Sequence, residues 1–327
     1  ATIGSARVSE LLDESTPLQD ANENNAYTIS ISAEDAAVSA SDLNAINAIT
    51  SIAVNLVNVT SITASDFDDL TTLNTNRAEF SNITGITAIT VTDNGGGDES
   101  VDYGTLETII DNYQTNFNSD VAFSLQSGDT IVIDTDSELS AFLTDIASGA
   151  LIIANQSITI DSSSPITVSQ ASKIDDLTTG VITATIGSAR VSDLLGSASL
   201  SDENENNAYT ISISEEDATG LTVTQLNAVN ELTSLPVDAA AVTAISGNYT
   251  DIVDLYTSSL PEILPPIGVS GLGDEAITIT DELTVTQANI LDDLTTGVIT
   301  ATIGSARVSE LLDAVSYTHL TLPTMRT

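Results

Sequence analysis

The sequence has 327 residues, with 47 Asp and Glu against 6 Lys and Arg, so its formal net charge is −41. Apolar residues make up 41% of the chain, which is the composition of a folded protein and not of a disordered acidic tail. The charge excludes nucleic acid and anionic membranes as electrostatic partners. The lack of Cys excludes disulfides, and no stretch has the ~20 apolar residues of a membrane-inserted helix.

One segment occurs three times in the chain. Its copies are ATIGSARVSELL at 1–12, ATIGSARVSDLL at 184–195 and ATIGSARVSELL at 301–312. Residues 166–195 align without gaps on 283–312, with 24 of 30 positions identical. A second segment, ENNAYTISIS, occurs at 23–32 and 205–214. The chain is therefore interpreted as an array of tandem units.

Short helices are predicted where apolar residues recur three positions apart, because this spacing places them on one helix face. The four stripes are Leu43/Ile46/Ile49, Ala171/Ile174/Leu177, Leu226/Val229/Leu232 and Ala288/Leu291/Leu294. Each stripe follows a Ser or Thr that is predicted to cap the helix, and then an acidic or amide residue that suits a helix N-terminus. The predicted caps are Ser41, Ser169, Thr224 and Thr286, followed by Asp42, Gln170, Gln225 and Gln287.

Strands are predicted where β-branched residues alternate with polar ones. These segments are 181–186, 209–214, 236–242, 277–281 and 298–303. Strands that alternate with short helices at a regular interval favour an α/β repeat solenoid of strand–helix coils with a parallel sheet. The alternative is a β-solenoid in which the predicted helices are irregular corners.

The repeats divide the chain into four parts. Residues 1–94 and 166–313 are repeat arrays, and 314–327 is a tail without repeats. Residues 95–165 depart from the pattern and contain two longer predicted helices, Thr105–Phe117 and Ser137–Ser148. We expect this segment to form atypical coils of the same array or a small insertion.

The tail has an unusual composition, since it holds the only His and the only Met of the chain. Its residues Val315–Thr324, VSYTHLTLPT, match the translation of a transposon-end sequencing adapter. We therefore expect 314–327 to be adapter read-through without a role in the fold. Because Ala1 lies inside a repeated segment, we also expect native sequence to precede it.

Several strings identify a family resemblance. VDAAAVTAISG (237–247), GVSGLGDEAITITD (268–281) and LTVTQANILDDLTTGVITATI (283–303) resemble the repeats of giant secreted or surface proteins of marine bacteria, especially picocyanobacteria. The resemblance covers most of 1–313, and 95–165 more weakly. It implies an extracellular or cell-surface location. The implied partners are other repeats of the same chain, the cell envelope or the extracellular matrix, and the resemblance transfers no catalytic residue.

Pairs of adjacent carboxylates are the commonest chemical motif. They are Asp68–Asp69, Asp175–Asp176 and Asp292–Asp293. We interpret the three pairs as copies of one motif at the same point of the repeat. General acid–base catalysis needs a carboxylate with a raised pKa in a cleft, whereas adjacent positions on a short helix face water. We therefore predict no catalytic, cofactor-binding or metal-binding residue.

A glycine-rich acidic turn is a candidate Ca²⁺-binding site. DNGGGDES (93–100) brings together Asp93, Asp98 and Glu99, and Asp102 follows. Oxygen ligands on such a turn suit Ca²⁺, although the sequence is neither an EF-hand loop nor a nonapeptide repeat. We interpret this segment as a solvated acidic turn, with weak Ca²⁺ binding as the alternative.

Threonines two residues apart recur along the chain and would lie on one strand face, as they do on ice-binding surfaces. The pairs are Thr90/Thr92, Thr183/Thr185, Thr222/Thr224, Thr278/Thr280, Thr284/Thr286 and Thr300/Thr302. Threonine is also an ordinary exposed strand residue, and Thr224 and Thr286 are predicted caps.

The expected function is a non-catalytic structural segment of a giant acidic extracellular repeat protein, as a stalk, spacer or surface layer. The alternative is an adhesin-type module that recognises a glycan, a cell surface or ice, with or without Ca²⁺. We predict that the chain is not an enzyme, because it lacks Trp and has only four Arg before residue 314 to build a substrate cleft.

Overall fold

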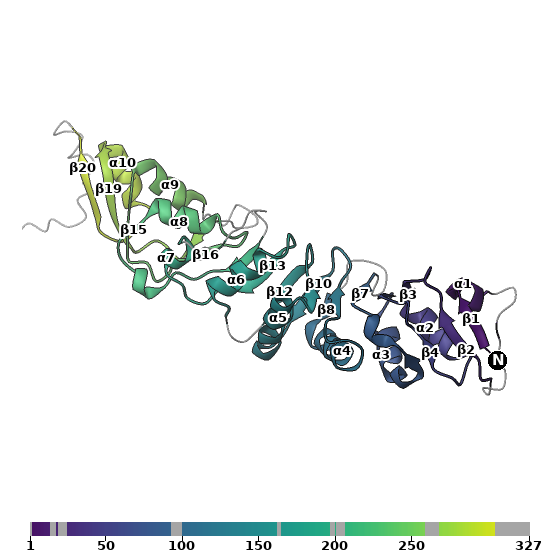
Figure 1. Ribbon diagram of the computed structural model, residues 1–327. Coiled ribbons are helices and arrows are strands. Elements are labelled where there is room, and N and C mark those ends of the chain that lie inside the picture. Colours follow the sequence, from purple (N-terminus) through teal and green to yellow (C-terminus); the bar gives the residue numbers. More distant parts are fainter. Residues whose placement is uncertain are drawn as a thin grey trace, which may run out of the picture. The chain divides into compact units, whose positions relative to one another are not determined.

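The structure is a computed structural model that describes residues 2–13, 18, 25–92, 100–161, 165–196, 200, 207–258 and 268–304. Within these residues the chain is α/β, with parallel strands and ten α-helices (Figure 1). This confirms the predicted α/β class with parallel strands. The segments predicted as helices are helices, so the alternative with irregular corners is wrong. The tail 314–327 lies outside the described residues.

The chain divides into two compact units. Unit 1 is Ala1–Ser164 with Ile174–Thr183, and unit 2 is Pro165–Lys173 with Ala184–Thr327. Helix α6 (Val168–Asp175) and strand β13 (Ile182–Thr185) contain residues of both units. The division into repeat arrays at 94/95 and 165/166 stays a prediction.

Unit 1 alternates short strands with helices. Its strands are β1 (Thr2–Ala6), β2 (Thr28–Ile31), β3 (Ala37–Ser39), β4 (Val54–Asn55), β5 (Ser61–Ala64), β6 (Phe80–Ser81), β7 (Ala88–Val91), β8 (Ser100–Asp102), β9 (Ala122–Ser124), β10 (Thr130–Ile133), β11 (Leu151–Ile152) and β12 (Ser157–Ile160). Its helices are α1 (Val8–Leu11), α2 (Ala40–Asn47), α3 (Phe67–Thr75), α4 (Tyr103–Asn116) and α5 (Asp136–Ser148), with 3₁₀ turns at Arg77–Glu79 and Ile83–Gly85.

The strands of unit 1 join three parallel sheets in chain order. One sheet has the order β1-β2-β4-β6, the second β11-β9-β7-β5-β3, and the third includes β13-β12-β10-β8. Paired residues in neighbouring strands lie a few tens of residues apart in sequence, as Ala88 and Ala122 do. Because each strand pairs with the one a full strand–helix segment later, every added segment extends the sheets by one strand.

Unit 2 repeats this arrangement. Its elements are α7 (Val191–Leu194), β14 (Ala208–Thr210), a 3₁₀ turn at Glu215–Asp217, β15 (Leu221–Thr222), α8 (Val223–Asn230), β16 (Val237–Asp238), β17 (Ala244–Gly247), α9 (Tyr249–Ser258), β18 (Val269–Ser270), β19 (Ala276–Leu283), α10 (Val285–Asp292) and β20 (Ile299–Ile303). Strands β15-β17-β19-β20 form one parallel sheet, and β16 pairs with β18 in another.

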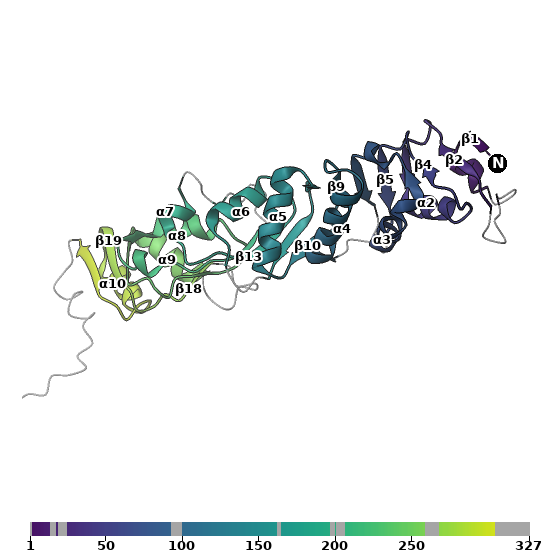
Figure 2. The same ribbon diagram turned by 60° about the horizontal axis from the view of Figure 1, so that its bottom comes forward.

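Successive helices pack on one another within each unit. In unit 1, α2 contacts α3, α3 contacts α4 and α4 contacts α5; in unit 2, α7 contacts α8 and α8 contacts α9. Figures 1 and 2 show this succession from two directions. The core lies between helices and strands, where inward residues such as Leu43, Ile46 and Ile62 are fully buried. Alternate strand residues face this core, as the period of two predicts.

The predicted helices and strands are mostly in place. The two long helices expected in 95–165 are α4 and α5, and the strands expected at 181–186, 277–281 and 298–303 are β13, β19 and β20. The segments at 209–214 and 236–242 form only the short strands β14 and β16. The third residue of each apolar stripe lies beyond the helix end, and Leu177 is therefore 43% exposed.

The predicted helix caps are wrong by two residues. Helix α8 begins after Thr222, whose hydroxyl accepts the N–H of Gln225 at 3.2 Å, while Gln225 Oε1 accepts the N–H of Thr222 at 2.9 Å. This reciprocal capping box satisfies two backbone donors, which the predicted cap Thr224 would not do. The same shift places the caps at Ser39, Thr167 and Thr284, in place of Ser41, Ser169 and Thr286.

Four buried threonines each bond a strand–helix segment to the preceding one. The hydroxyl of Thr178 donates to the carbonyl oxygen of Gln156 at 2.6 Å and accepts the N–H of Gly180 at 3.0 Å. Three other buried threonines donate in the same way: Thr50 to Tyr27, Thr233 to Tyr209 and Thr295 to Glu275. Each hydroxyl thus supplies a hydrogen-bond donor to a backbone carbonyl of the preceding segment.

The glycine of the repeated string DDLTTG permits this close approach. A Cβ atom on Gly180 would overlap the backbone of Gln156, and one on Gly297 would overlap the backbone of Glu275. After Thr178 and Thr295 the turn therefore needs glycine to lie this close to the preceding segment. After Thr50 and Thr233 the same position holds Ile52 and Leu235.

Candidate functional site

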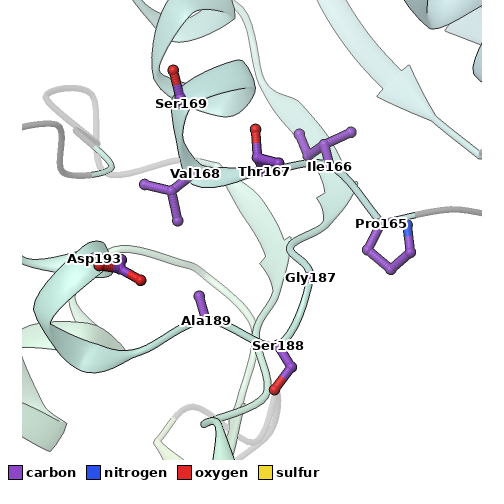
Figure 3. Close-up of a pocket in the computed structure, with 9 residues that line it drawn as sticks. All are labelled: Pro165, Ile166, Thr167, Val168, Ser169, Gly187, Ser188, Ala189 and Asp193. Carbon is purple, nitrogen blue, oxygen red and sulfur yellow. The ribbon is translucent and has the colours of Figure 1, made fainter.

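The first candidate site is a groove in unit 2 with a volume of about 300 Å³. It is lined by Pro165, Ile166, Thr167, Val168, Ser169, Gly187, Ser188, Ala189 and Asp193 (Figure 3). The hydroxyls of Ser169 and Ser188 point to opposite sides of this view. The hydroxyl of Thr167 is bonded to Gln170 within the helix cap. The groove thus presents one exposed carboxylate, Asp193, without a second acid or base directed at the same point.

A second groove, in unit 1, has a volume of about 330 Å³. It is lined by Val8, Ser9, Leu12, Asp35, Ala37, Val38, Ser39 and Asp42. The carboxylate of Asp35 accepts the N–H of Val8 at 2.8 Å, and Ser39 caps α2 by accepting the N–H of Asp42 at 3.0 Å. These polar groups therefore hold the local backbone together.

The prediction that the three carboxylate pairs recur at one point of the repeat is wrong. Asp68 and Asp69 lie in the first turn of α3, whereas the other two pairs lie at the ends of α6 and α10. Burial raises the pKa of Asp69, Asp66 and Asp68 raise it further, and a hydrogen bond from Asn44 lowers it. The second pair is Asp175–Asp176 and the third is Asp292–Asp293, of which Asp176, Asp292 and Asp293 are exposed.

Of the candidate calcium turn, only Asp102 can be placed. Its carboxylate caps α4 by accepting the N–H of Thr105 at 2.8 Å and the Thr105 hydroxyl at 2.6 Å. Asp93, Asp98 and Glu99 lie outside the described residues. In the described part of the chain, no group of three or more His, Cys, Asp or Glu residues is arranged to hold a metal ion.

The threonine pairs form one aligned row of hydroxyls in unit 2. Thr222 pairs with Ser246, Ser246 with Thr278, and Thr278 with Thr300, so one hydroxyl residue stands on each of four adjacent strands. Thr278 and Thr300 are exposed, whereas Thr222 also serves as the cap of α8. The register shifts between β19 and β20 after Thr278, where Glu282 pairs with Thr302, so a second aligned row does not form there.

An acidic cluster lies between α4 and α5. The hydroxyl of Tyr103 donates to Asp145 Oδ2 at 2.6 Å. Burial raises the pKa of Asp145 above its ordinary value, the Tyr103 hydrogen bond lowers it, and Asp111 raises it again. Burial also raises the pKa of Glu107, and Asp111, Asp145 and Glu138 add to this effect. Burial and the neighbouring carboxylates thus disfavour the charged forms of Glu107 and Asp145. Their ionisation at neutral pH therefore lowers the stability of the folded state.

Two structural sites were not predicted from the sequence. Gln156 and Glu275 are buried just before strands β12 and β19, and each accepts two backbone N–H groups of the residues before it. The signal was a long polar side chain directly before an alternating strand. Arg7 forms an ion pair with Glu34, and Arg190 forms one with Glu216. The sequence signal for these ion pairs was the same arginine repeated in a chain that has only six basic residues.

Comparison with family models, curated proteins and solved structures found no match to this chain. The helices of the described residues are all too short or too polar to cross a membrane.

Proposed function

We propose that this chain is a non-catalytic structural segment of an acidic extracellular repeat protein, folded as a solenoid of strand–helix coils. Its role is that of a stalk, spacer or surface layer. Its partners are neighbouring repeats of the same chain and the cell envelope or extracellular matrix.

The bonding between successive segments supports this proposal. The buried hydroxyls of Thr50, Thr178, Thr233 and Thr295 each bond to a backbone carbonyl of the preceding segment. Such contacts between neighbours are what hold a solenoid together, because each coil buries its apolar residues only against the next. The same type of bond recurs at four places along the chain, which suits a chain that transmits force or spans distance.

Stretching the full chain between its ends tests the proposal. A solenoid is expected to unfold in steps that each release one or a few coils, about 70–120 Å of extended chain for a coil of roughly 20–34 residues. Thr178→Val should lower the force of some steps, because it removes the hydroxyl bond to Gln156. A single event that releases the whole chain at once would contradict the solenoid.

A second candidate function is a binding module for a glycan or ice. The row Thr222, Ser246, Thr278 and Thr300 favours it, since aligned hydroxyls on adjacent strands stand about 4.8 Å apart. Thermal hysteresis and glycan-binding measurements on the full chain test it, with Thr278→Lys as the variant and Thr243→Lys, at an exposed loop position, as the control. Equal behaviour of both variants would remove this candidate.

A further inference from the structure

The inference concerns a buried carboxylate in unit 2. Glu275 lies directly before β19 and is 0% exposed. Its oxygen Oε2 accepts the N–H groups of Gly273 and Asp274 at 2.6 and 3.2 Å. The other carboxylate oxygen, Oε1, is buried and has no hydrogen-bond partner among the described residues. Buried charges in proteins are normally paired, so this oxygen lacks a partner that its environment requires.

Gln156 of unit 1 shows which partners this position has. It lies directly before β12, and its oxygen Oε1 also accepts two backbone N–H groups. Its nitrogen Nε2 donates to the carbonyl oxygens of Leu125 and Gln126 at 3.1 and 2.9 Å. These two residues stand four and three positions before Asp129, whose carbonyl accepts the N–H of Ser157 at 2.9 Å. The far end of this glutamine side chain therefore contacts two carbonyl oxygens of the preceding segment.

The backbone around Glu275 has the corresponding carbonyls. The N–H of Ala276 donates to the carbonyl of Thr243 at 2.8 Å, and the residues four and three positions before Thr243 are Ala239 and Ala240. Strand register supports this alignment. The residue after the buried side chain pairs with the first residue of β10 in unit 1 and of β17 in unit 2. Glu275 Oε1 thus corresponds to an amide nitrogen that donates to two carbonyls.

Close backbone contacts join the two loops of unit 2 that surround this position. The N–H of Ala239 donates to the carbonyl of Ser270 at 2.8 Å. A Cβ atom on Gly271 would lie only 2.7 Å from the backbone nitrogen of Ala240. Ala239 is 0% exposed, as the buried glutamate is. The segment that leads to the glutamate therefore lies against the segment that carries the two carbonyls, in a place shielded from bulk water.

The exchange of nitrogen for oxygen removes the hydrogen-bond donor. An amide nitrogen donates, whereas carboxylate and carbonyl oxygens only accept. Oxygens that face one another in a buried place repel strongly, because the local dielectric constant is low. The ion pairs found in the described part of the chain, Arg7–Glu34 and Arg190–Glu216, involve other carboxylates. A positive charge from solution would therefore complete this site.

We propose that Glu275 Oε1 and the carbonyl oxygens of Ala239 and Ala240 bind a sodium ion. Carboxylate and backbone carbonyl oxygens are the ligands that hard cations such as Na⁺ accept in proteins. One positive charge balances one carboxylate, whereas a divalent ion would leave a net charge buried. The net charge of −41 raises the concentration of cations around the chain.

The ion does in unit 2 what the amide of Gln156 does in unit 1, which is to connect a buried side chain to carbonyls of the preceding segment. The connection before β12 is therefore complete in any buffer, and the connection before β19 is complete only with sodium. Because a ligand that binds only the folded state stabilises it, sodium should protect β19 from local unfolding. This inference does not depend on the structural role proposed above.

Hydrogen–deuterium exchange of the full chain, followed by mass spectrometry, tests the proposal. Exchange is compared in NaCl and in tetramethylammonium chloride at equal ionic strength, because both salts screen charges and only sodium is small enough for a buried site. With sodium at about ten times its dissociation constant, the amides of 276–283 should exchange about tenfold more slowly in NaCl. The amides of 157–160 should exchange equally in both salts, because Gln156 supplies its own donor.

Variants show whether the effect belongs to the buried carboxylate. Glu275→Gln should abolish the difference between the two salts. In tetramethylammonium chloride its β19 amides should exchange more slowly than those of wild type, because the amide supplies a donor. Asp274→Asn is the matched control and should keep the full difference, since Asp274 is exposed. Gln156→Glu should acquire a sodium dependence at 157–160.

Three results would overturn the proposal. The first is equal exchange of the wild-type β19 amides in both salts. The second is a difference between the salts that persists in Glu275→Gln or disappears in Asp274→Asn, because the effect would then arise elsewhere. The third is protection of β19 that increases as pH is lowered, after correction for the intrinsic exchange rate, and is the same in both salts. That result would show that a proton occupies this position in place of sodium.

Discussion

At the scale of single residues, the clearest contrast is between Gln156 and Glu275. Both are buried, with 3% and 0% of the side chain exposed, and both accept two backbone N–H groups through one oxygen. The side-chain amide nitrogen Nε2 of Gln156 donates to the carbonyl oxygens of Leu125 and Gln126 at 3.1 and 2.9 Å. The equivalent oxygen of Glu275 is buried without a hydrogen-bond partner.

Glu275→Gln is expected to raise the free energy of unfolding by about 1 kcal/mol, because the amide nitrogen supplies a donor where the carboxylate has none. Gln156→Glu is the reciprocal variant and should lower the free energy of unfolding by about 1–3 kcal/mol, since two carbonyls lose their donor. Urea denaturation at neutral pH measures both. Two variants that shift stability in the same direction would contradict the equivalence of these positions.

At the scale of elements, short helices depend on their ends. Helix α8 has eight residues and α10 has eight, too few to be stable in isolation. Each begins with a reciprocal capping box between a Thr and a Gln three residues later. The string T-V-T-Q offers two threonines as caps. Only the first threonine places Gln at the third helical position, where the Gln side chain can accept the backbone N–H of the capping threonine.

Thr222→Ala should lower the free energy of unfolding by about 1 kcal/mol, as loss of an N-cap does. Thr224→Ala is the matched control, because Thr224 is exposed inside the first turn, and its effect should be within about 0.5 kcal/mol of zero. Thermal unfolding followed by circular dichroism distinguishes the two. If Thr224→Ala lowered the free energy of unfolding more than Thr222→Ala, the result would support Thr224 as the cap, as predicted from the sequence.

The helix pair α4–α5 makes stability depend on pH. The folded state raises the pKa of Glu107 above its ordinary 4.5 and that of Asp145 above its ordinary 3.8. The folded chain therefore binds protons more tightly than the unfolded chain. The free energy of unfolding should fall as pH rises from the ordinary values through the raised ones, and it should recover as pH is lowered again.

Glu107→Gln is expected to stabilise the chain at pH 7 by about 0.2–0.5 kcal/mol, because it removes a like-charge pair with Asp111 one helical turn away. The difference from wild type should shrink as pH falls toward 4. Denaturation curves across this range measure it, and Asp176→Asn, at an exposed position, is the control. A difference that grows toward acid pH would reverse the assigned sign.

At the scale of the whole molecule, the charge of −41 is spread along the sequence and is not gathered in one tract. Both ion pairs found among the described residues use copies of the same arginine, Arg7 and Arg190. Most carboxylates therefore repel one another without a cationic partner. Net charge of this size destabilises a compact state through self-repulsion.

Added NaCl should therefore raise the unfolding midpoint, because it shortens the screening length from about 30 Å at 0.01 M to about 3 Å at 1 M. The rise should be steepest at low salt, where screening changes most. Calorimetry in a series of NaCl concentrations checks it, with sucrose as a control that stabilises without screening. A flat midpoint would show that self-repulsion does not limit stability.

Much of the fold could be predicted from local patterns. The helices α4 and α5 and the strands β13, β19 and β20 follow from periods of 3.6 and 2, which are properties of a few consecutive residues. The repeated arginine marks Arg7 as a candidate for a polar contact, but local patterns do not identify Glu34 as its partner or Asp145 as the partner of Tyr103, because these partners lie 27 and 42 residues apart. Their meeting depends on strand register, which the local pattern does not contain.

By itself, the sequence determined the repeats, the α/β class and the excess of negative charge, since each is written in composition or in short-range spacing. Only the tertiary structure decided which Thr caps each helix, which buried hydroxyl bonds the preceding segment, and that Glu275 lacks the partner that Gln156 has. These outcomes depend on backbone atoms of another strand–helix segment. Those atoms come within hydrogen-bond distance only when parallel strands align.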